Sequence, residues 1–493
     1  MPERAPARAL LWLIGGGLAV RVLLASAIGL GVDESYMVAA GRTLHLGYFD
    51  HPPVAWWLSA GAARLAGSEA AVVVRLPFIA LFAVSTWLMY RLTAALFTPR
   101  AGLCAAIAFN LAPVFSLSTA GWVLPDGPLT CALLGMALCL ASALFPRPGK
   151  VGEGAWPPWL GAGVAAGLAL LSKYSAALVI AGAFAGMLTA PGLRPWLRRP
   201  QPYVAALLAL AVFAPELIWN AQHGWASFAF QGGRAAAARL QPFGPFVTTA
   251  GQAAFLLPWI WLGLMAVLLR GLRAGPGAAP TWLLCGMASV PILLFPVVSL
   301  WSRNVLFHWA APGYLMLFPA LGAWAAGWRP RTVRRWSGAT ALLLAVGLLV
   351  ATSEVRFNWL ARIAPGLDPG LQARDWTPLR QELAARGLLG RPIGVPNWSD
   401  TGKVAYALGP DIVVLCMNPD AREFAFAPGP EAHIGEDILL VAPRQTPARI
   451  AASLAADFES IETLTPARLR LSGRSDVDIP LYLAHRLRHW PRP

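Results

Sequence analysis

The sequence predicts a polytopic α-helical membrane protein with about eleven transmembrane helices and a small C-terminal α/β domain outside the cytoplasm. Hydrophobic residues make up 57% of the 493 residues and charged residues 13%, whereas roughly a quarter of the residues in soluble domains are charged. Apolar runs of about 20 residues, enough for a helix to cross roughly 30 Å of hydrocarbon, recur over the first two thirds of the chain. Composition and the repeated apolar runs together predict this fold class.

The predicted spans cover residues 9–30, 71–97, 101–120, 128–145, 159–172, 174–190, 201–219, 247–269, 281–300, 305–326 and 335–352. The two spans beside Lys173 are short, which favours two tilted helices that meet at a polar turn. Residues 353–493 return to a soluble composition, with strand-like runs at 412–416 and 438–441. We therefore expect a transmembrane domain over 1–352 and a separate α/β domain over 353–493.

Basic residues in the short loops indicate the orientation, because loops rich in Lys and Arg stay in the cytoplasm. With the N-terminus inside, the basic clusters around Arg100, Arg198 and Arg334 are also inside. Two long segments, 31–70 and 220–246, then form outer loops, and the first contains an aromatic stretch typical of an interfacial helix. This orientation predicts a multi-pass protein with its N-terminus inside and its C-terminal domain on the outer face. The membrane that we expect is the bacterial inner membrane, which makes the C-terminal domain periplasmic.

Several other function classes find little support. The net charge of +15 comes from Arg clusters in short gaps between apolar runs, which does not predict a nucleic-acid surface. The five cysteines show no pair at metal-ligand or redox spacing, and there is no glycine-rich phosphate loop. No metal site is predicted. The adjacent acids Asp33 and Glu34 leave a divalent cation open as a cofactor, although no third ligand is fixed.

Polar residues gather at the ends of apolar runs on the predicted outer face. Ionisable groups near hydrocarbon are costly and often mark a reaction site, although Asp126 also fits a turn cap, Lys173 a snorkelling side chain and His308 a structural hydrogen bond. A carboxylate such as Asp33 can accept a proton from a hydroxyl, and Lys173 and Arg303 can stabilise charge on a phosphate leaving group. A substrate with a lipid tail and a phosphate head fits this layout.

Six short motifs follow one another along the chain. They are DESY at 33–36, GYFDHPP at 47–53, RLP at 75–77, PDGPL at 125–129, LSKYS at 171–175 and IWNAQHGW at 218–225. In this order they resemble the family 39 membrane glycosyltransferases of the GT-C superfamily, which include protein O-mannosyltransferases and lipid A aminoarabinose transferases. The resemblance covers roughly residues 10–330 and implies a GT-C type fold.

The resemblance also implies roles for individual residues. Asp33 takes the place of the catalytic base, Glu34 supports it, and Asp126 is the acidic residue of the second outer loop. The donor phosphate is expected near Lys173, Arg303 and His51. The residues expected to bind substrate are Tyr36, Tyr174, Glu216, His223 and His308.

The function implied by the resemblance is an inverting transfer of a sugar from a polyprenyl phosphate, such as undecaprenyl phosphate, without a nucleotide. The acceptor is a hydroxyl of a glycolipid, a polysaccharide or a protein on the periplasmic face. Two alternatives stay open from the sequence: a transporter or flippase of a lipid-linked sugar, and a non-catalytic scaffold that presents its outer domain.

Overall fold

The computed structural model describes residues 4–146, 155–234, 239–364, 370–443, 445–471 and 475–490. The chain divides into two compact units. The first unit comprises Met1–Val22, His45–Ala55 and Leu76–Leu344, and the second comprises Leu23–Leu44, Trp56–Arg75 and Ala345–Pro493. The longest segment of the second unit begins at Ala345, close to the predicted boundary at residue 352. However, the second unit also includes most of segment 31–70, which was predicted to belong to the transmembrane domain.

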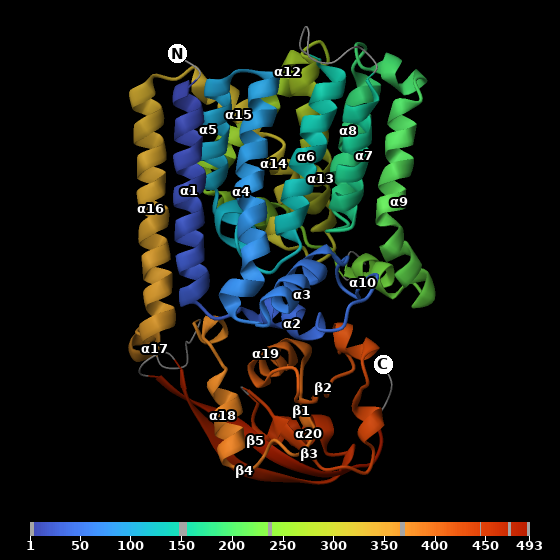
Figure 1. Ribbon diagram of the computed structural model, residues 1–493, viewed down its shortest axis with the longest axis vertical. Coiled ribbons are helices and arrows are strands. Elements are labelled where there is room, and N and C mark those ends of the chain that lie inside the picture. Colours follow the sequence, from blue (N-terminus) through green and yellow to red (C-terminus); the bar gives the residue numbers. More distant parts are fainter. Residues whose placement is uncertain are drawn as a thin grey trace. The chain divides into compact units, whose positions relative to one another are not determined.

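Helices that lie in or enter the first unit (Figure 1) are α1 (Arg4–Ala27), α4 (Ala71–Leu96), α5 (Pro99–Asn110), α6 (Asp126–Leu144), α7 (Trp156–Leu170), α8 (Ala176–Thr189), α9 (Gln201–Gln222), α10 (Ala226–Arg234), α11 (Gly244–Leu256), α12 (Pro258–Ala274), α13 (Ala279–Val298), α14 (Ala311–Leu315), α15 (Phe318–Ala326) and α16 (Pro330–Phe357). Small residues allow close helix pairs, as is usual between membrane helices. Gly163 of α7 lies against the backbone of α9 at Ala205, and Gly322 of α15 lies against α5 at Ala101.

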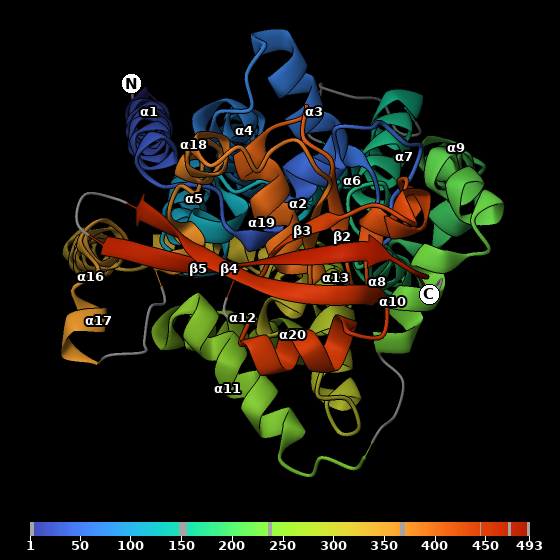
Figure 2. The ribbon, with the colours of Figure 1, turned by 90° about the horizontal axis from the view of Figure 1, so that it is seen from below.

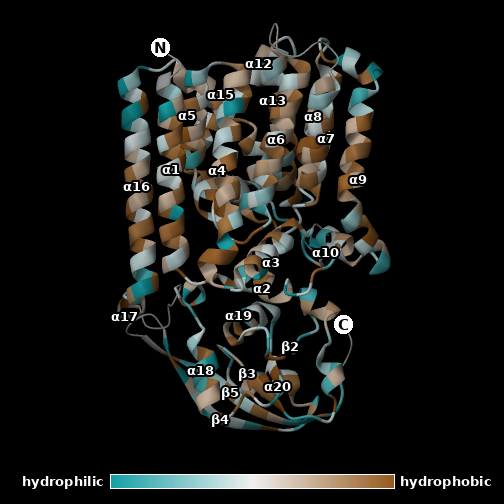
Figure 3. Ribbon diagram, viewed as in Figure 1, coloured by the Kyte–Doolittle hydropathy of each residue, from teal (hydrophilic) through white to brown (hydrophobic). Residues whose placement is uncertain are grey.

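The described residues contain six helices that are long and apolar enough to cross a membrane: Pro6–Ala27, Ala71–Leu96, Asp126–Leu144, Gln201–Gln222, Ala279–Val298 and Pro330–Phe357. Helices α11 and α12 form a seventh if they are one span, although they meet at an angle of 110°. Figure 3 shows that hydrophobic residues are frequent along these helices. The multi-pass membrane class is therefore confirmed, with fewer unbroken spans than the eleven predicted.

The remaining predicted spans are interrupted or short helices. Span 101–120 divides at Pro113 into α5 and a π-helix, η1 (Val114–Thr119), and span 305–326 divides into the 3₁₀ helix η3 (Phe307–Ala310), α14 and α15. Spans 159–172 and 174–190 correspond to α7 and α8, with 15 and 14 residues. Apolar composition alone does not reveal these breaks, because it counts side chains and ignores where the backbone turns.

A five-stranded sheet forms the centre of the second unit (Figure 2), with the strand order β2-β1-β3-β5-β4. Strands β1 (Ile393–Val395), β2 (Val414–Cys416) and β3 (Ile438–Val441) are parallel, and β4 (Phe458–Leu471) and β5 (Ser475–Leu487) form an antiparallel hairpin. The predicted strands at 412–416 and 438–441 are confirmed. The helices of this unit are α2 (Val32–Ala40), α3 (Val54–Ala66), α17 (Leu360–Ile363), α18 (Pro378–Ala385), α19 (Trp398–Leu408) and α20 (Pro447–Leu454).

Candidate functional site

Asp126 and Lys173 form the central ion pair of the first unit. Asp126 is the first residue of α6, and Lys173 lies in the turn between α7 and α8. Nζ of Lys173 lies 2.9 Å from each carboxylate oxygen of Asp126. The lysine side chain is 11% exposed and the aspartate side chain 17%. Because an ammonium group has three N–H donors, Lys173 keeps capacity for a further anionic partner.

Two imidazoles lie near this pair, and a guanidinium lies near one of them. His51 and His308 lie within electrostatic range of Asp126, and His308 also lies within range of Lys173 and Arg234. We name these five residues the Asp126 cluster. Lys173 and Arg234 supply two cations for one carboxylate, so the cluster favours an anion such as phosphate, to which both side chains bind well.

Arg234 is a member of the cluster that the sequence analysis assigned no role. Its guanidinium lies 4.6 Å from the centre of the Trp309 ring, and Ser302 Oγ donates to its carbonyl oxygen over 2.8 Å. The predicted cation, Arg303, lies exposed in the turn after α13, and its role at the donor phosphate stays a prediction. The signal for Arg234 was its position at the end of an aromatic stretch in segment 220–246.

Backbone contacts hold His51 in the first unit. The amide of Val54 donates to the carbonyl of Leu171 over 3.3 Å, two residues before Lys173. The side chain of Gln231 on α10 donates to the carbonyl of Asp50. Both sides of His51 are therefore tied to elements that carry cluster residues. The structure thus brings His51, Asp126, Lys173 and His308 together, as expected for residues of one site.

Glu216 organises a buried network around the turn that holds Lys173. Its side chain on α9 is fully buried and accepts hydrogen bonds from the Tyr174 hydroxyl and, over 2.8 Å, from Asn220 Nδ2. The Tyr174 hydroxyl also lies 2.6 Å from Ser227 Oγ on α10. Gly47 packs so closely on Glu216 that a Cβ there would overlap the carboxylate. Glu216 and Tyr174, predicted to bind substrate, thus connect α9, α10 and the Lys173 turn.

His223 closes the end of α9. Its ring stacks on Trp219 with 4.3 Å between the ring centres, and Nδ1 lies 2.8 Å from the Trp219 carbonyl. Burial and the nearby His223 lower the pKa of His45 in segment 31–70. These contacts give His223 a helix-ending role, and its predicted substrate contact stays a prediction.

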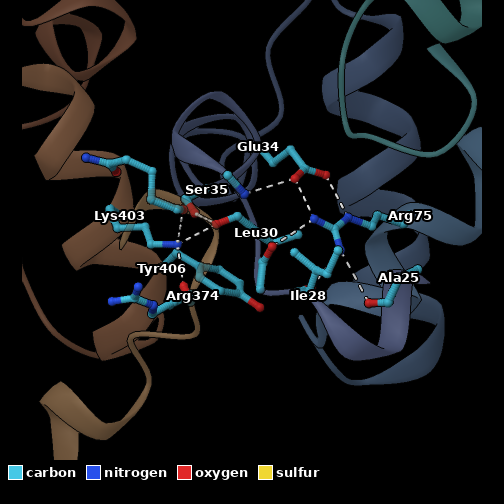
Figure 4. A network of polar contacts seen from close by, with 12 residues as sticks. Ala25, Ile28, Leu30, Glu34, Ser35, Arg75, Arg374, Lys403 and Tyr406 are labelled. Atoms are coloured by element: carbon cyan, nitrogen blue, oxygen red, sulfur yellow. Dashed lines mark hydrogen bonds and ion pairs between the residues drawn. The ribbon is translucent and has the colours of Figure 1, made fainter. Parts of the chain in front are cut away.

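Glu34 and Arg75 form a second ion pair, which lies within the second unit and is fully enclosed (Figure 4). Arg75 Nε and Nη2 donate to the two carboxylate oxygens over 2.8 and 2.6 Å, and both side chains are 4% exposed. Glu34 also accepts from the Gly31 amide at the start of α2 over 2.9 Å. The other guanidinium N–H groups donate to the carbonyls of Ala25, Ile28 and Gly29. The predicted supporting role of Glu34 is thus structural.

Asp33 differs from Glu34 in its surroundings. It is exposed in the first turn of α2, where the positive end of the helix dipole favours an ionised carboxylate. Arg75 donates a hydrogen bond to each oxygen of Glu34, and a divalent cation shared by Asp33 and Glu34 stays a prediction. No group of three or more His, Cys, Asp or Glu side chains suited to a metal ion occurs in the described parts of the chain.

Tyr36 packs inside the second unit. It is 2% exposed, and its ring makes edge contacts with Trp56, Trp398 and Phe424. Its hydroxyl accepts a hydrogen bond from the Glu423 amide over 2.9 Å. This placement makes Tyr36 a packing residue that fixes α2 to the C-terminal segment, and its predicted substrate contact stays a prediction.

Comparisons with known proteins extend this picture. No curated protein matches the chain by sequence. Residues 50–219 match a family model described as dolichyl-phosphate-mannose-protein mannosyltransferase. The structure of ArnT from Cupriavidus metallidurans in the apo state is similar over 97% of this chain and 98% of that chain, with 15% identity and a TM-score of 0.67. ArnT bound to undecaprenyl phosphate gives 16% identity and a TM-score of 0.67, over 96% of this chain and 97% of that one.

The chain has the GT-C fold. The family model supports the resemblance inferred from the motifs over residues 50–219, and the structural match shows that nearly the whole chain shares the fold of ArnT. Within this GT-C fold, the family model spans Asp126, Lys173 and Glu216. Asp33, His308 and the cation Arg234 lie beyond the matched residues, so their assignment depends on motif position and on the geometry described above.

Proposed function

We propose that this chain is an inverting glycosyltransferase that moves a sugar from a polyprenyl-phosphate carrier to an acceptor hydroxyl. The observation that carries the proposal is the Asp126 cluster, an anion-favouring group at the ends of apolar helices in a GT-C fold. The ArnT structure that shares this fold contains undecaprenyl phosphate. That ligand combines a phosphate head, which suits Lys173 and Arg234, with a lipid tail, which suits the apolar helices.

The reaction is a single displacement. The acceptor oxygen attacks the anomeric carbon, the bond between that carbon and the phosphate oxygen breaks, and its electron pair leaves with the polyprenyl phosphate. Lys173 and Arg234 stabilise the charge that develops on the phosphate, as preorganised cations do in such transition states. Asp33 accepts the proton of the attacking hydroxyl. The configuration at the anomeric carbon inverts because only one displacement occurs.

Asp33 is the best candidate for the base because of the contrast within α2. Its neighbour Glu34 is enclosed by Arg75, whereas the carboxylate of Asp33 is exposed. A general base must reach the proton that it removes, and this requirement excludes Glu34. Arg303 is retained as an alternative second cation, because its exposed side chain is long enough to move towards a bound phosphate.

The cellular setting is also a proposal. The Lys and Arg residues of the short loops support a cytoplasmic N-terminus and a periplasmic C-terminal domain in a bacterial inner membrane. The acceptor is then a glycolipid, a polysaccharide or a protein that reaches the periplasmic face. The alternative of a transporter or flippase for a lipid-linked sugar gains no support from the described residues.

Mass spectrometry of envelope glycolipids and glycoproteins from a deletion strain tests the function directly. We expect one sugar to disappear from one class of acceptor and to return with the wild-type chain. Complementation with Asp33→Asn should leave that sugar absent, although the variant protein is present in the membrane in equal amount. Full restoration by this variant would remove Asp33 from the role of base. An envelope that stays unchanged on deletion would contradict the transferase itself.

A further inference from the structure

Lys403 lies in the middle of α19 and is buried. It is 1% exposed, and no carboxylate lies within ion-pair distance of its ammonium group among the described residues. A buried charge is costly unless it is well hydrogen-bonded. The position is therefore unusual for lysine, and its contacts explain why the residue is there.

Three backbone carbonyls surround the ammonium group, one for each of its N–H donors. Nζ of Lys403 donates to the Leu30 carbonyl and, over 2.9 Å each, to the carbonyls of Gln372 and Arg374. Leu30 lies in the turn just before α2, whereas Gln372 and Arg374 belong to the C-terminal segment. Figure 4 shows Lys403 joining these two parts of the second unit.

The same turn is held from its other side by Arg75, which donates to the carbonyls of Ile28 and Gly29 over 2.8 and 2.9 Å. Gly29 itself lies so close to the Arg374 backbone that a Cβ would overlap it. Lys403 and Arg75 therefore fix three consecutive carbonyls, 28 to 30, at the entry to α2. Helix α2 begins at Val32, directly after this turn and one residue before Asp33, so its direction depends on this clamp.

Helix packing reinforces the contact. Gly402, next to Lys403 on α19, lies against the backbone of Tyr36, where a Cβ would be within 2.5 Å of Cα. The Tyr36 ring contacts Trp398 at the start of α19 with 5.2 Å between ring centres. Helices α2 and α19 thus pack at close range along their length, and a displacement of α19 displaces α2.

We propose that Lys403 is a positioning residue for the transfer reaction, because it fixes the turn from which α2 presents Asp33. This inference rests on the proposed function, in which Asp33 is the base. The C-terminal domain then takes part in catalysis through α2, and its contribution is the orientation of the base. Binding of the donor phosphate by Lys173 does not depend on it.

Hydrogen exchange of the full chain in detergent tests the clamp without any assay of activity. In Lys403→Met, which keeps an unbranched chain and removes the three donors, we expect amides of residues 32–36 to exchange about tenfold faster, since three buried carbonyls lose their donor. Strands β1 and β3 should keep wild-type protection. Lys403→Gln retains an amide donor and should restore part of the protection in 32–36. Wild-type exchange of 32–36 in Lys403→Met would overturn the proposal.

A split between binding and turnover tests the consequence for catalysis. Lys403→Met should bind undecaprenyl phosphate within about twofold of wild type, whereas its sugar product in the complemented deletion strain should fall about tenfold at equal protein level. Arg386→Met is a matched control, because Arg386 donates to the carbonyls of Thr465 and Pro466 over 2.8 and 3.0 Å within the same domain. Arg386→Met should change neither the affinity for undecaprenyl phosphate nor the amount of sugar product by more than about twofold.

Each remaining outcome is decisive. Faster exchange in 32–36 together with wild-type product formation would show that the clamp does not matter for Asp33, and would overturn the proposal. Equal losses of product in Lys403→Met and Arg386→Met would reduce Lys403 to a general stabiliser of the domain. Failure of the proposed function gives a different result. In that case, the strain that carries Asp33→Asn still forms the sugar product, and the hydrogen exchange of this variant equals that of the wild type. If Lys403→Met does not accumulate, Lys403→Gln replaces it in both measurements.

Discussion

The molecule contains two pairs of a carboxylate and a cation that differ in exposure and in the hydrogen bonds that they can still form. In the first unit, Asp126 and Lys173 are 17% and 11% exposed and share two hydrogen bonds. In the second unit, Glu34 and Arg75 are 4% exposed, and backbone groups take up the remaining hydrogen-bonding capacity of Arg75. The first pair has a donor left for a ligand, whereas the second is committed to holding the chain. Accessibility and spare donors therefore separate a reaction site from a scaffold.

The largest expected effect comes from Asp33→Asn, which removes the proposed base beside the buried pair. We expect sugar transfer to fall by about 10²- to 10⁴-fold, the usual contribution of general base catalysis. The measurement is transfer from a polyprenyl-phosphate sugar in proteoliposomes. The unfolding temperature should stay at the wild-type value, because Asp33 is exposed. If Asp33→Asn loses activity only because it unfolds, Asp33 has a structural role like that of Glu34 and is not the base.

Glu34→Gln should show the opposite pattern. Breaking a buried ion pair from one side typically costs about 3–5 kcal/mol, because the remaining charge stays buried without its partner. We expect a large fall in the unfolding temperature of the detergent-solubilised protein. Any protein that remains folded should still bind undecaprenyl phosphate with near wild-type affinity. Unchanged stability would mean that the Glu34–Arg75 pair does not hold α2.

Tyr174→Phe tests the support behind Lys173. The substitution removes a hydrogen bond to the buried Glu216 carboxylate and leaves Asn220 as its side-chain donor, at a cost of about 1–3 kcal/mol. We expect a lower unfolding temperature together with a weaker donor affinity, since the turn that carries Lys173 is loosened. A matched control is Tyr203→Phe, whose hydroxyl is exposed and donates to the Leu197 carbonyl. Equal behaviour of the two variants would contradict a special role for the Glu216 network.

A smaller effect is expected from pH. Burial lowers the pKa of Lys403 to about 8, while nearby Glu34 and Asp375 oppose this shift and Arg75 adds to it. Between pH 8 and the ordinary lysine pKa of about 10.4, the unfolded chain binds more protons than the folded chain, so this lysine makes the free energy of unfolding rise with pH. The slope is at most about 1.4 kcal/mol per pH unit. Between pH 7.5 and 9.5, the unfolding temperature should rise more for the wild type than for Lys403→Met. Parallel curves of unfolding temperature against pH would show that the pKa of Lys403 is not lowered.

Much of the architecture was accessible from the sequence, because apolar length and basic loops depend on local composition. Asp126, Lys173 and His308 could be placed on one face for the same reason. Hydropathy missed the breaks at Pro113 and around Leu257, since both lie in apolar surroundings. The hairpin of β4 and β5 had a readable signal, because buried Ala467 and Leu469 alternate with exposed Arg468 and Arg470.

The pairing of Glu34 with Arg75 could not be inferred, since 41 residues separate them and each fits a solvated loop when taken alone. Lys403 was missed for a similar reason, because its partners are backbone carbonyls that leave no mark in the sequence. The enclosure of Tyr36 by aromatic rings from α3 and the C-terminal segment could not be predicted either. Long-range packing decides such roles, and only three-dimensional structure reveals it.

The affinity for undecaprenyl phosphate of wild type and Lys173→Met, measured side by side in detergent, tests the central claim most directly. The account predicts a loss of about 10- to 100-fold, as expected for a charge-assisted hydrogen bond to phosphate, with a smaller fall in unfolding temperature than in Glu34→Gln, because the Asp126–Lys173 pair is less buried. Equal affinity of the two proteins would contradict the assignment of the accessible pair as the phosphate site.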